Sequence, residues 1–349
     1  MKRENIIFCK ETRKELKAVF ELFNAREIFV LMDETTEKHC YPRIKEIIPE
    51  ALPIVIPFGD ESKCLSTLVT VWDTLQKYGA TRNSLLLNVG GGMVTDLGGF
   101  AAATFKRGIP FVNLPTTLLA MVDAAIGGKT AINFGDVKNL IGAFYPAKAV
   151  LIDPSFLQTL DLPNLLSGYA EMLKHGLLSD EMHWRSLLSV DWEQKDVYAL
   201  LPLVKRSISI KTEVVEKDPL ETGIRQALNL GHTIGHSIES WALCRHLPVL
   251  HGYAVAWGLI AELYLSYTKA GFPKDKLLST VNYIRENYGK PAFSCKDYEA
   301  LYAFMLQDKK NVSATEVRFT LLSDIGEIRT GETFSKEEIF EALDFLIEI

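Results

Sequence analysis

Residues 84–105, SLLLNVGGGMVTDLGGFAAATF, combine a short apolar run, three consecutive glycines and a helical pattern. This order indicates a buried strand, a tight turn and the start of a helix. Glycines in such a turn allow backbone N–H groups to approach a phosphate at the positive end of the helix. Gly98 and Gly99 would let the helix pack closely on a neighbouring backbone or on a cofactor. The turn differs from G-x-G-x-x-G, so a plain tight turn is the alternative to a dinucleotide site.

The sequence around this turn alternates strand-like and helical patterns. Apolar runs at 27–32, 52–56 and 110–114 are typical of buried strands, and apolar residues recur at helical spacing over 65–75. Alternating strands and helices predict a parallel sheet, and the glycine turn follows a strand near the middle of the series, where dinucleotides bind. Long helical patterns dominate from Pro154, with a hairpin expected at 317–330 and a last helix capped by Ser335 and Glu338. We expect an α/β N-terminal domain and a mainly α-helical C-terminal domain, divided near 150–160.

Composition excludes several classes of protein. The chain has 349 residues, 38 Lys+Arg against 44 Asp+Glu and a formal net charge of −6, without a basic block, which argues against general nucleic-acid binding. No apolar stretch reaches the ~18–20 residues of a membrane span, and the N-terminal apolar run is too short for a signal peptide. The five cysteines form no C-x-x-C, as expected of buried thiols in a reducing compartment. We expect a cytoplasmic enzyme that does not bind a membrane.

Histidines and one glutamate interrupt apolar helical patterns. LNLGHTIGHSIE places His232 and His236 four residues apart, His251 opens the next apolar helix, and Glu171 lies in GYAEMLKHG. Imidazoles and a carboxylate that converge from separate helices would form an open catalytic site of the Zn²⁺ type. The alternative is a histidine pair of ordinary structural role, since Thr233 replaces the general-base glutamate of HExxH. Three other histidines lie in charged or loop-like surroundings and are expected at the surface: His39, His183 and His246.

A second glycine cluster, at 127–130, imitates the end of a P-loop. A P-loop requires a glycine six residues before its lysine, but the residue six positions before Lys129 is Asp123. We therefore reject an NTPase, although Lys129 can still hold an anion. Other cations also stand beside glycine or apolar residues: Lys138, Lys174, Lys211 and Arg225. Any one of them can be an ordinary solvated residue. Gathered round a metal, they would bind a polyanion such as a substrate with both phosphate and carboxylate.

The chain resembles the 3-dehydroquinate synthase family over essentially its whole length. The segments that carry the resemblance are NVGGGMVTDLGGFAAATFKRG (88–108), LPTTLLAMVDAAIGGKTAINFGDVKNLIGAFYP (114–146), GYAEMLKHG (168–176), RQALNLGHTIGHSIE (225–239), HGYAVAWG (251–258) and DKKN (308–311). The resemblance implies a Rossmann-like NAD-binding domain over 1–155 and a mainly α-helical metal- and substrate-binding domain over 156–349, usually in a homodimer.

The family resemblance also implies a reaction. 3-Deoxy-D-arabino-heptulosonate 7-phosphate becomes 3-dehydroquinate and phosphate through transient oxidation by NAD, phosphate elimination, re-reduction and aldol cyclisation. NAD and a divalent metal (Zn or Co) are the implied cofactors, and NAD is regenerated in every turnover.

Matched position by position, the resemblance implies site residues. It places metal ligands on Glu171, His232 and His251, where the ion would lower the pKa of the substrate hydroxyl, and a proton-handling role on His236. The implied substrate contacts are Lys129, Asn139, Lys174, Lys211, Arg225, Asn229 and Lys310, the last preferred to Lys309. The implied NAD contacts are Asp33, Asp60, Lys63, Gly91, Gly92, Asp96, Thr116 and Thr117, with Asp123, Lys129 and Lys138 between cofactor and substrate. The family commonly has Glu where Asp60 stands, so Glu61 is the alternative for the cofactor ribose.

Three other functions compete with this one. Another sugar-phosphate cyclase would change residues that meet the substrate carboxylate and ring, whereas Arg225, Asn229 and His236 keep the dehydroquinate-type pattern. A metal-dependent polyol dehydrogenase would share the fold and the glycine turn but would not need so many cations, and it would release NADH. A non-catalytic NAD-binding regulatory protein would need neither the metal ligands nor the lysines.

Overall fold

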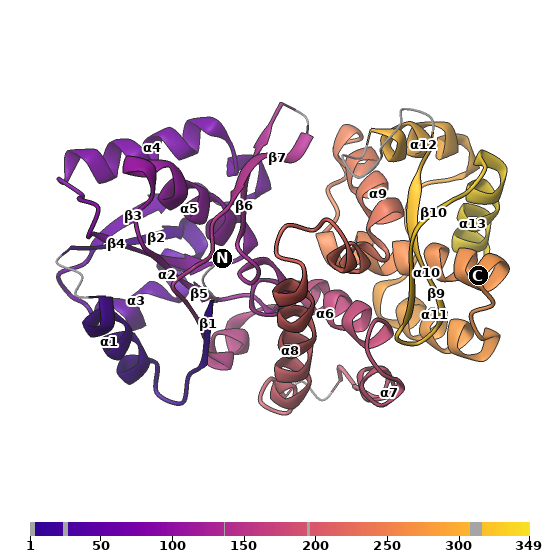
Figure 1. Cartoon of the computed structure of the whole chain (residues 1–349), viewed down its shortest axis with the longest axis horizontal. Coiled ribbons are helices and arrows are strands. Elements are labelled where there is room, and N and C mark those ends of the chain that lie inside the picture. The colour runs from indigo at the N-terminus through magenta and orange to yellow at the C-terminus, as the bar shows by residue number, and fades with distance from the viewer. Residues whose placement is uncertain (1–3, 24–26, 136, 194–195, 308–315) are drawn as a thin grey trace. The chain divides into compact units, whose positions relative to one another are not determined.

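The computed structural model describes residues 4–23, 27–135, 137–193, 196–307 and 316–349. The chain forms two compact units, Met1–Asp161 with Val197–Leu201, and Leu162–Asp196 with Pro202–Ile349 (Figure 1). The first unit is α/β and the second is mainly helical, which confirms the predicted fold class.

A six-stranded parallel sheet forms the centre of the N-terminal unit, in the order β1-β8-β5-β4-β2-β3. Its strands are β1 (Asn5–Phe8), β2 (Ile28–Asp33), β3 (Leu52–Ile56), β4 (Leu85–Gly90), β5 (Phe111–Pro115) and β8 (Ala149–Ile152). Every residue of β4, β5 and β8 is buried, as is usual for parallel strands that are covered on both faces. The four predicted strands are therefore confirmed to within one residue at each end.

Helices and one hairpin complete this unit: α1 (Thr12–Phe23), α2 (Glu34–His39), α3 (Tyr41–Lys45), α4 (Leu65–Lys77), α5 (Gly92–Thr104), and the antiparallel β6 (Lys129–Phe134) and β7 (Val137–Phe144). A Cβ added to Gly98 would lie 2.1 Å from Asn88 Oδ1 on β4, and one added to Gly99 would lie 2.5 Å from Thr130 Cγ2 on β6. The two glycines of α5 therefore permit the close packing that the sequence predicts.

The C-terminal unit contains α6 (Leu162–Leu177), α7 (Glu181–Leu188), α8 (Leu201–Lys217), α9 (His232–Cys244), α10 (His251–Ala270), α11 (Lys274–Tyr288), α12 (Tyr298–Leu306) and α13 (Lys336–Glu348). Its central element is α10, which packs against α6, α9, α11 and α13. The hairpin expected at 317–330 is β9 (Arg318–Asp324) with β10 (Glu327–Thr333). The predicted cap of the last helix also forms, because Ser335 Oγ accepts the N–H of Glu338 and the Glu338 carboxylate accepts the N–H of Ser335.

One histidine prediction is wrong. His39 and His246 are exposed as expected, but His183 is only 5% exposed. Its Nε2 lies 3.2 Å from Ser207 Oγ on α8. The polar neighbours of His183 in the sequence suggested a surface position, whereas α7 turns this side chain toward the interior. Among the described residues, no helix is long and apolar enough to cross a membrane.

Candidate active site

The glycine turn lies at the carboxyl end of β4. Gly91 precedes α5 and Gly92 begins it, while Thr116 donates its N–H to Gly90 O (3.0 Å) from the end of β5. A Cβ on Gly91 would stand 3.2 Å from Thr117 Cγ2. Four predicted cofactor residues therefore gather where open α/β sheets bind ligands, at a helix N-terminus that favours phosphate.

Polar residues from three further segments meet near this edge. The buried Lys63, after β3, donates from Nζ to Asp96 Oδ2 on α5 (2.5 Å) and to Asn139 Oδ1 on β7 (2.5 Å). Lys138, also on β7, pairs with Asp60 (Nζ to Oδ2, 3.1 Å). The structure thus brings together residues that lie 33 and 76 positions apart in the chain.

The other predicted residues of this unit are more scattered. Asp33 ends β2, and its Oδ1 accepts the N–H of Thr36 (2.7 Å), which caps α2. Asp123 is half-buried in the helical turn Ala120–Ala124, and Lys129 is exposed at the start of β6.

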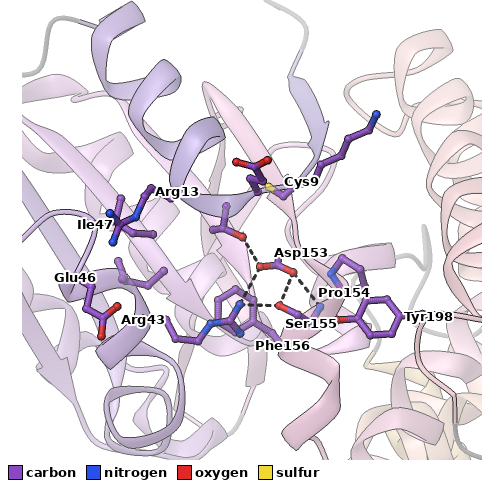
Figure 2. A pocket seen from close by; sticks show the side chains of 14 residues that line it. Cys9, Arg13, Arg43, Glu46, Ile47, Asp153, Pro154, Ser155, Phe156 and Tyr198 are labelled. Carbon is purple, nitrogen blue, oxygen red and sulfur yellow. Dashed lines mark hydrogen bonds and ion pairs between the residues drawn. The ribbon is translucent and has the colours of Figure 1, made fainter.

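A separate pocket of about 560 Å³ opens at the carboxyl ends of β1 and β8 (Figure 2). Asp153 lies at its centre and accepts hydrogen bonds from the N–H and Oγ of Ser155 (2.9 and 2.6 Å) and from the hydroxyl of Thr12. Arg43 stacks over Phe156 at 4.5 Å and donates to Ser155 Oγ (2.8 Å). None of the predicted site residues lines this pocket, and its polar contacts tie loops of the unit together.

The predicted metal ligands converge in the C-terminal unit. Glu171 comes from α6, and His232 and His251 each begin a helix. Glu171 Oε1 lies 3.3 Å from His232 Nε2 and 3.2 Å from His251 Nε2, and one candidate ligand atom from each residue lies within 4.8 Å of the others. Around a tetrahedral Zn²⁺ with bonds of about 2.05 Å, ligand atoms stand roughly 3.3 Å apart. The spacing therefore suits a small divalent ion.

The outer contacts of both imidazoles favour the same conclusion. His232 donates its Nδ1–H to Leu230 O (3.0 Å), and His251 donates its Nδ1–H to Glu239 Oε2 (3.1 Å). Such contacts direct the Nε2 atoms toward the ion in metal sites. The other oxygen of Glu171 forms an ion pair with Lys174, one turn along α6. Nitrogen and carboxylate donors of this kind are typical ligands of Zn²⁺ and Co²⁺.

Burial and nearby charges set the protonation states. Burial favours the neutral acid of Glu171, but the Lys174 ammonium and His232 hold its pKa well below the usual range. Burial, reinforced by Lys174, lowers the pKa of His232 to about 3. Burial also opposes the charge on His251, yet Glu239 and Glu171 raise its pKa to about 10. The neutral His232 thus turns an Nε2 lone pair toward a carboxylate oxygen, a contact that a cation between them would make favourable.

His236 lies one helical turn after His232. The centroid of its ring is 5.2 Å from that of His232 and 6.0 Å from that of His251, and the side chain is half-buried. His236 is therefore beside the candidate ligands, as its predicted proton-handling role requires.

The predicted anion-binding cations of this unit are deeply buried: Lys174 and Arg225 are each 1% exposed and Lys211 is 6% exposed. Arg225 donates from NH1 to Pro219 O (2.8 Å), and Asn229 donates from Nδ2 to Glu221 Oε1 (3.2 Å). Lys174 pairs with Glu171, and a phosphate or carboxylate group of a ligand is an anion with which buried cations form charge-assisted hydrogen bonds. Lys309 and Lys310 lie outside the described residues.

Sequence reasoning missed four acidic residues that accept hydrogen bonds from the candidate site residues or from the backbone beside them: Asp218, Glu221, Glu239 and Glu262. Glu239 and Glu262 interrupt apolar helical patterns in the same way as Glu171 does, and that signal could have found them. Asp218 and Glu221 lie in a polar loop, where the sequence offers no such signal.

Two family models match adjoining parts of the chain. Residues 53–167 match the N-terminal model of 3-dehydroquinate synthase and residues 168–311 match the C-terminal model. The chain belongs to the 3-dehydroquinate synthase family. It is 47% identical over 350 residues to 3-dehydroquinate synthase of Parabacteroides distasonis, a match that covers 100% of this chain and 99% of that protein.

The chain is also similar in fold to solved sugar-phosphate cyclases. The 2-epi-5-epi-valiolone synthase of Streptomyces hygroscopicus subsp. jinggangensis, solved with NAD⁺ and Zn²⁺ bound, is 25% identical, with a TM-score of 0.85 and coverage of 99% of this chain and 97% of that one. A 2-deoxy-scyllo-inosose synthase is 22% identical, with a TM-score of 0.85 and coverage of 97% and 96%.

Proposed function

We propose that the chain is a 3-dehydroquinate synthase, a phosphate-eliminating lyase of the shikimate pathway. Its substrate would be 3-deoxy-D-arabino-heptulosonate 7-phosphate, converted to 3-dehydroquinate and phosphate. Family membership supports this reaction. The observation that carries it is the position of Glu171 Oε1, within 3.3 Å of the Nε2 atoms of His232 and His251.

The residues present fit both implied cofactors. Glu171, His232 and His251 would hold Zn²⁺ or Co²⁺. The turn at Gly91 and Gly92 would hold the NAD phosphates, with further contacts from Asp33, Asp60, Lys63, Asp96, Thr116, Thr117, Asp123, Lys129 and Lys138. When bound, the metal supplies a Lewis acid for a substrate hydroxyl and NAD supplies a transient hydride acceptor.

The remaining residues would bind the substrate and move its protons. Lys174, Lys211 and Arg225 would hold phosphate and carboxylate groups through charge-assisted hydrogen bonds, with Lys129, Asn139, Asn229 and Lys310 as further contacts. His236 would exchange a proton with the substrate oxygen nearest the candidate ligands. The buried surroundings would exclude water from the charges that develop there.

The homodimer and the cytoplasmic location also stay proposals. The homodimer rests on the family resemblance, and the cytoplasmic location rests on composition and cysteine usage.

Removing a ligand tests the metal centre directly. We expect His251→Ala to abolish bound metal in elemental analysis and to abolish release of phosphate from the heptulosonate phosphate, because two donors cannot hold the ion as three do. A chelator should have the same effect on the unchanged protein, and added Zn²⁺ or Co²⁺ should reverse it. The exposed His39→Ala is the matched control. A His251→Ala protein with the full metal content would refute the ligand assignment.

A further inference from the structure

Glu262 is a fully buried carboxylate, on α10, that the proposed chemistry does not use. Its Oε2 accepts the N–H of Gly231 (2.6 Å), and its Oε1 accepts the N–H groups of Thr233 (3.0 Å) and Ile234 (3.1 Å). These amides surround His232 at the start of α9. The carboxylate therefore satisfies N–H groups that a helix start leaves without intrahelical partners, and it does so at the positive end of the helix dipole.

The backbone geometry brings Glu262 within reach of α9. Gly231 has φ +79°, a conformation that favours glycine, and a Cβ there would lie 2.8 Å from the side chain of Leu259. One turn before Glu262, a Cβ on Gly258 would lie 2.0 Å from Gly231 O. The two helices thus approach closely at this point, and the first turn of α9 is fixed against α10.

Asp218 accepts backbone N–H groups beside Arg225 in the same way as Glu262 does beside His232. Its Oδ2 accepts the N–H groups of Gly223 (2.6 Å) and Arg225 (3.1 Å), and its Oδ1 accepts the N–H of Thr222 (3.0 Å). A nearly buried carboxylate, 8% exposed, therefore organises the loop that leads into Arg225.

We propose that Glu262 and Asp218 are separate positioning residues for the two halves of the site. Glu262 fixes His232, and through it the metal; Asp218 fixes Arg225, and through it the anionic substrate. This inference rests on the proposed function. The surroundings of the site then divide into a metal half and an anion half, and in each half one carboxylate organises the backbone through hydrogen bonds to N–H groups.

Glu262→Gln changes one carboxylate oxygen into an NH₂ group of nearly the same size. Whichever way the amide is turned, at least one backbone N–H then faces a donor and loses its acceptor inside the protein. The first turn of α9 must shift, and the Nε2 of His232 shifts with it. Substitutions of outer residues typically weaken metal binding by about 10–100-fold.

The test compares Glu262→Gln, Asp218→Asn and Ser266→Ala in the full chain. Ser266 is a matched control on α10, because its buried Oγ accepts the N–H of Leu322 (3.1 Å) and donates to the backbone oxygen of Glu262 (2.8 Å). Ser266→Ala therefore removes buried hydrogen bonds at the same place on α10 and leaves the Glu262 carboxylate unchanged. The readouts are the Kd of Co²⁺, the visible spectrum of the Co²⁺-loaded protein, the KM for the heptulosonate phosphate and the midpoint of urea unfolding.

We expect Glu262→Gln to raise the Kd of Co²⁺ at least about tenfold and to alter the Co²⁺ spectrum. Asp218→Asn should leave both unchanged and raise KM about tenfold or more, with unchanged affinity for NAD. Ser266→Ala should lower the unfolding midpoint without either effect. If Glu262→Gln does not fold, Glu262→Asp, which draws the carboxylate back by one methylene, takes its place.

A Co²⁺ Kd and spectrum unchanged in the Glu262 variant would overturn the inference for Glu262, and so would equal changes in Ser266→Ala. A rise in KM no larger in Asp218→Asn than in Ser266→Ala would overturn the inference for Asp218. If the unchanged protein binds no Co²⁺, the proposed metal centre itself fails. That result differs from failure of the inference, in which the unchanged protein binds the ion and the variant binds it equally well.

Discussion

At the scale of single residues, the two candidate histidine ligands differ in charge because their neighbouring side chains differ. Burial, together with the nearby Lys174 ammonium, lowers the pKa of His232 and keeps it neutral, whereas Glu239 and Glu171 raise the pKa of His251, which keeps its proton. An ion that binds Nε2 of His251 must displace that proton. The affinity for metal should therefore rise with pH across the neutral range.

His183 gives a residue-scale prediction for stability. Burial lowers its pKa to about 4, from about 6.5, so between these values the unfolded chain binds a proton that the folded chain does not. The free energy of unfolding should therefore fall as the pH is lowered from 7.5 to 5, with His183 responsible for about 1–2 kcal/mol. In His183→Gln this part of the loss should disappear, as measured by urea unfolding at both pH values.

The exposed His39→Gln serves as the control for His183. Its stability should change with pH as the unchanged protein does. An equally steep loss in His183→Gln would show that His183 does not titrate with the expected pKa.

The sequence identifies the candidate ligands better than it identifies the residues that hydrogen-bond the backbone beside them. Glu171, His232 and His251 are conspicuous because polar groups in apolar helices need a compensating partner. Glu262 carries the same signal, yet its role depends on contacts with amides 28 to 31 positions away, which only the folded chain defines. The surface position predicted for His183 is wrong for the same reason, since α7 packs against α6 and the His183 ring lies against Ser207 on α8, contacts that only the folded chain defines.

At the scale of elements, α10 can pack closely against α6 because Gly252 has no side chain. A Cβ on Gly252 would lie 1.9 Å from the backbone oxygen of Ser167 on α6. Because a backbone atom cannot move to another rotamer, Gly252→Ala should force the helices apart. We expect it to lower the free energy of unfolding by about 1–3 kcal/mol in chemical denaturation.

The control for Gly252→Ala is Thr268→Ala on the exposed side of the same helix. It changes helix propensity without a clash and should stay within about 0.5 kcal/mol of the unchanged protein. Equal stability of the two variants would contradict the close packing of α6 and α10.

Predictable elements are those with a strong local pattern. The strands β2, β3, β4 and β5 stand out as apolar runs between helical patterns, but β1 and β8 have only four residues each. These two strands are paired with each other across more than 140 positions, and such pairing leaves no local trace. The β6–β7 hairpin was also missed, because no residue of β7 is fully buried and its sequence does not alternate.

At the scale of the whole molecule, a net charge of −6 conceals a set of buried cations. Lys63, Lys174, Lys211 and Arg225 are each at most 6% exposed, although the chain as a whole is acidic. Of the cations that stand beside glycine or apolar residues in the sequence, Lys174, Lys211 and Arg225 are buried, whereas Lys138 is half-buried and Lys129 is exposed. The distribution of charge therefore says more about the substrate than the total does.

The most direct test of the central claim is the ratio of phosphate released to NAD supplied. The protein is incubated with Zn²⁺ or Co²⁺, NAD⁺ below the amount of substrate, and 3-deoxy-D-arabino-heptulosonate 7-phosphate. A synthase that regenerates its cofactor should release many phosphates per NAD, form 3-dehydroquinate and accumulate no NADH. Accumulation of NADH in step with substrate loss, or no phosphate with either metal, would contradict the assignment.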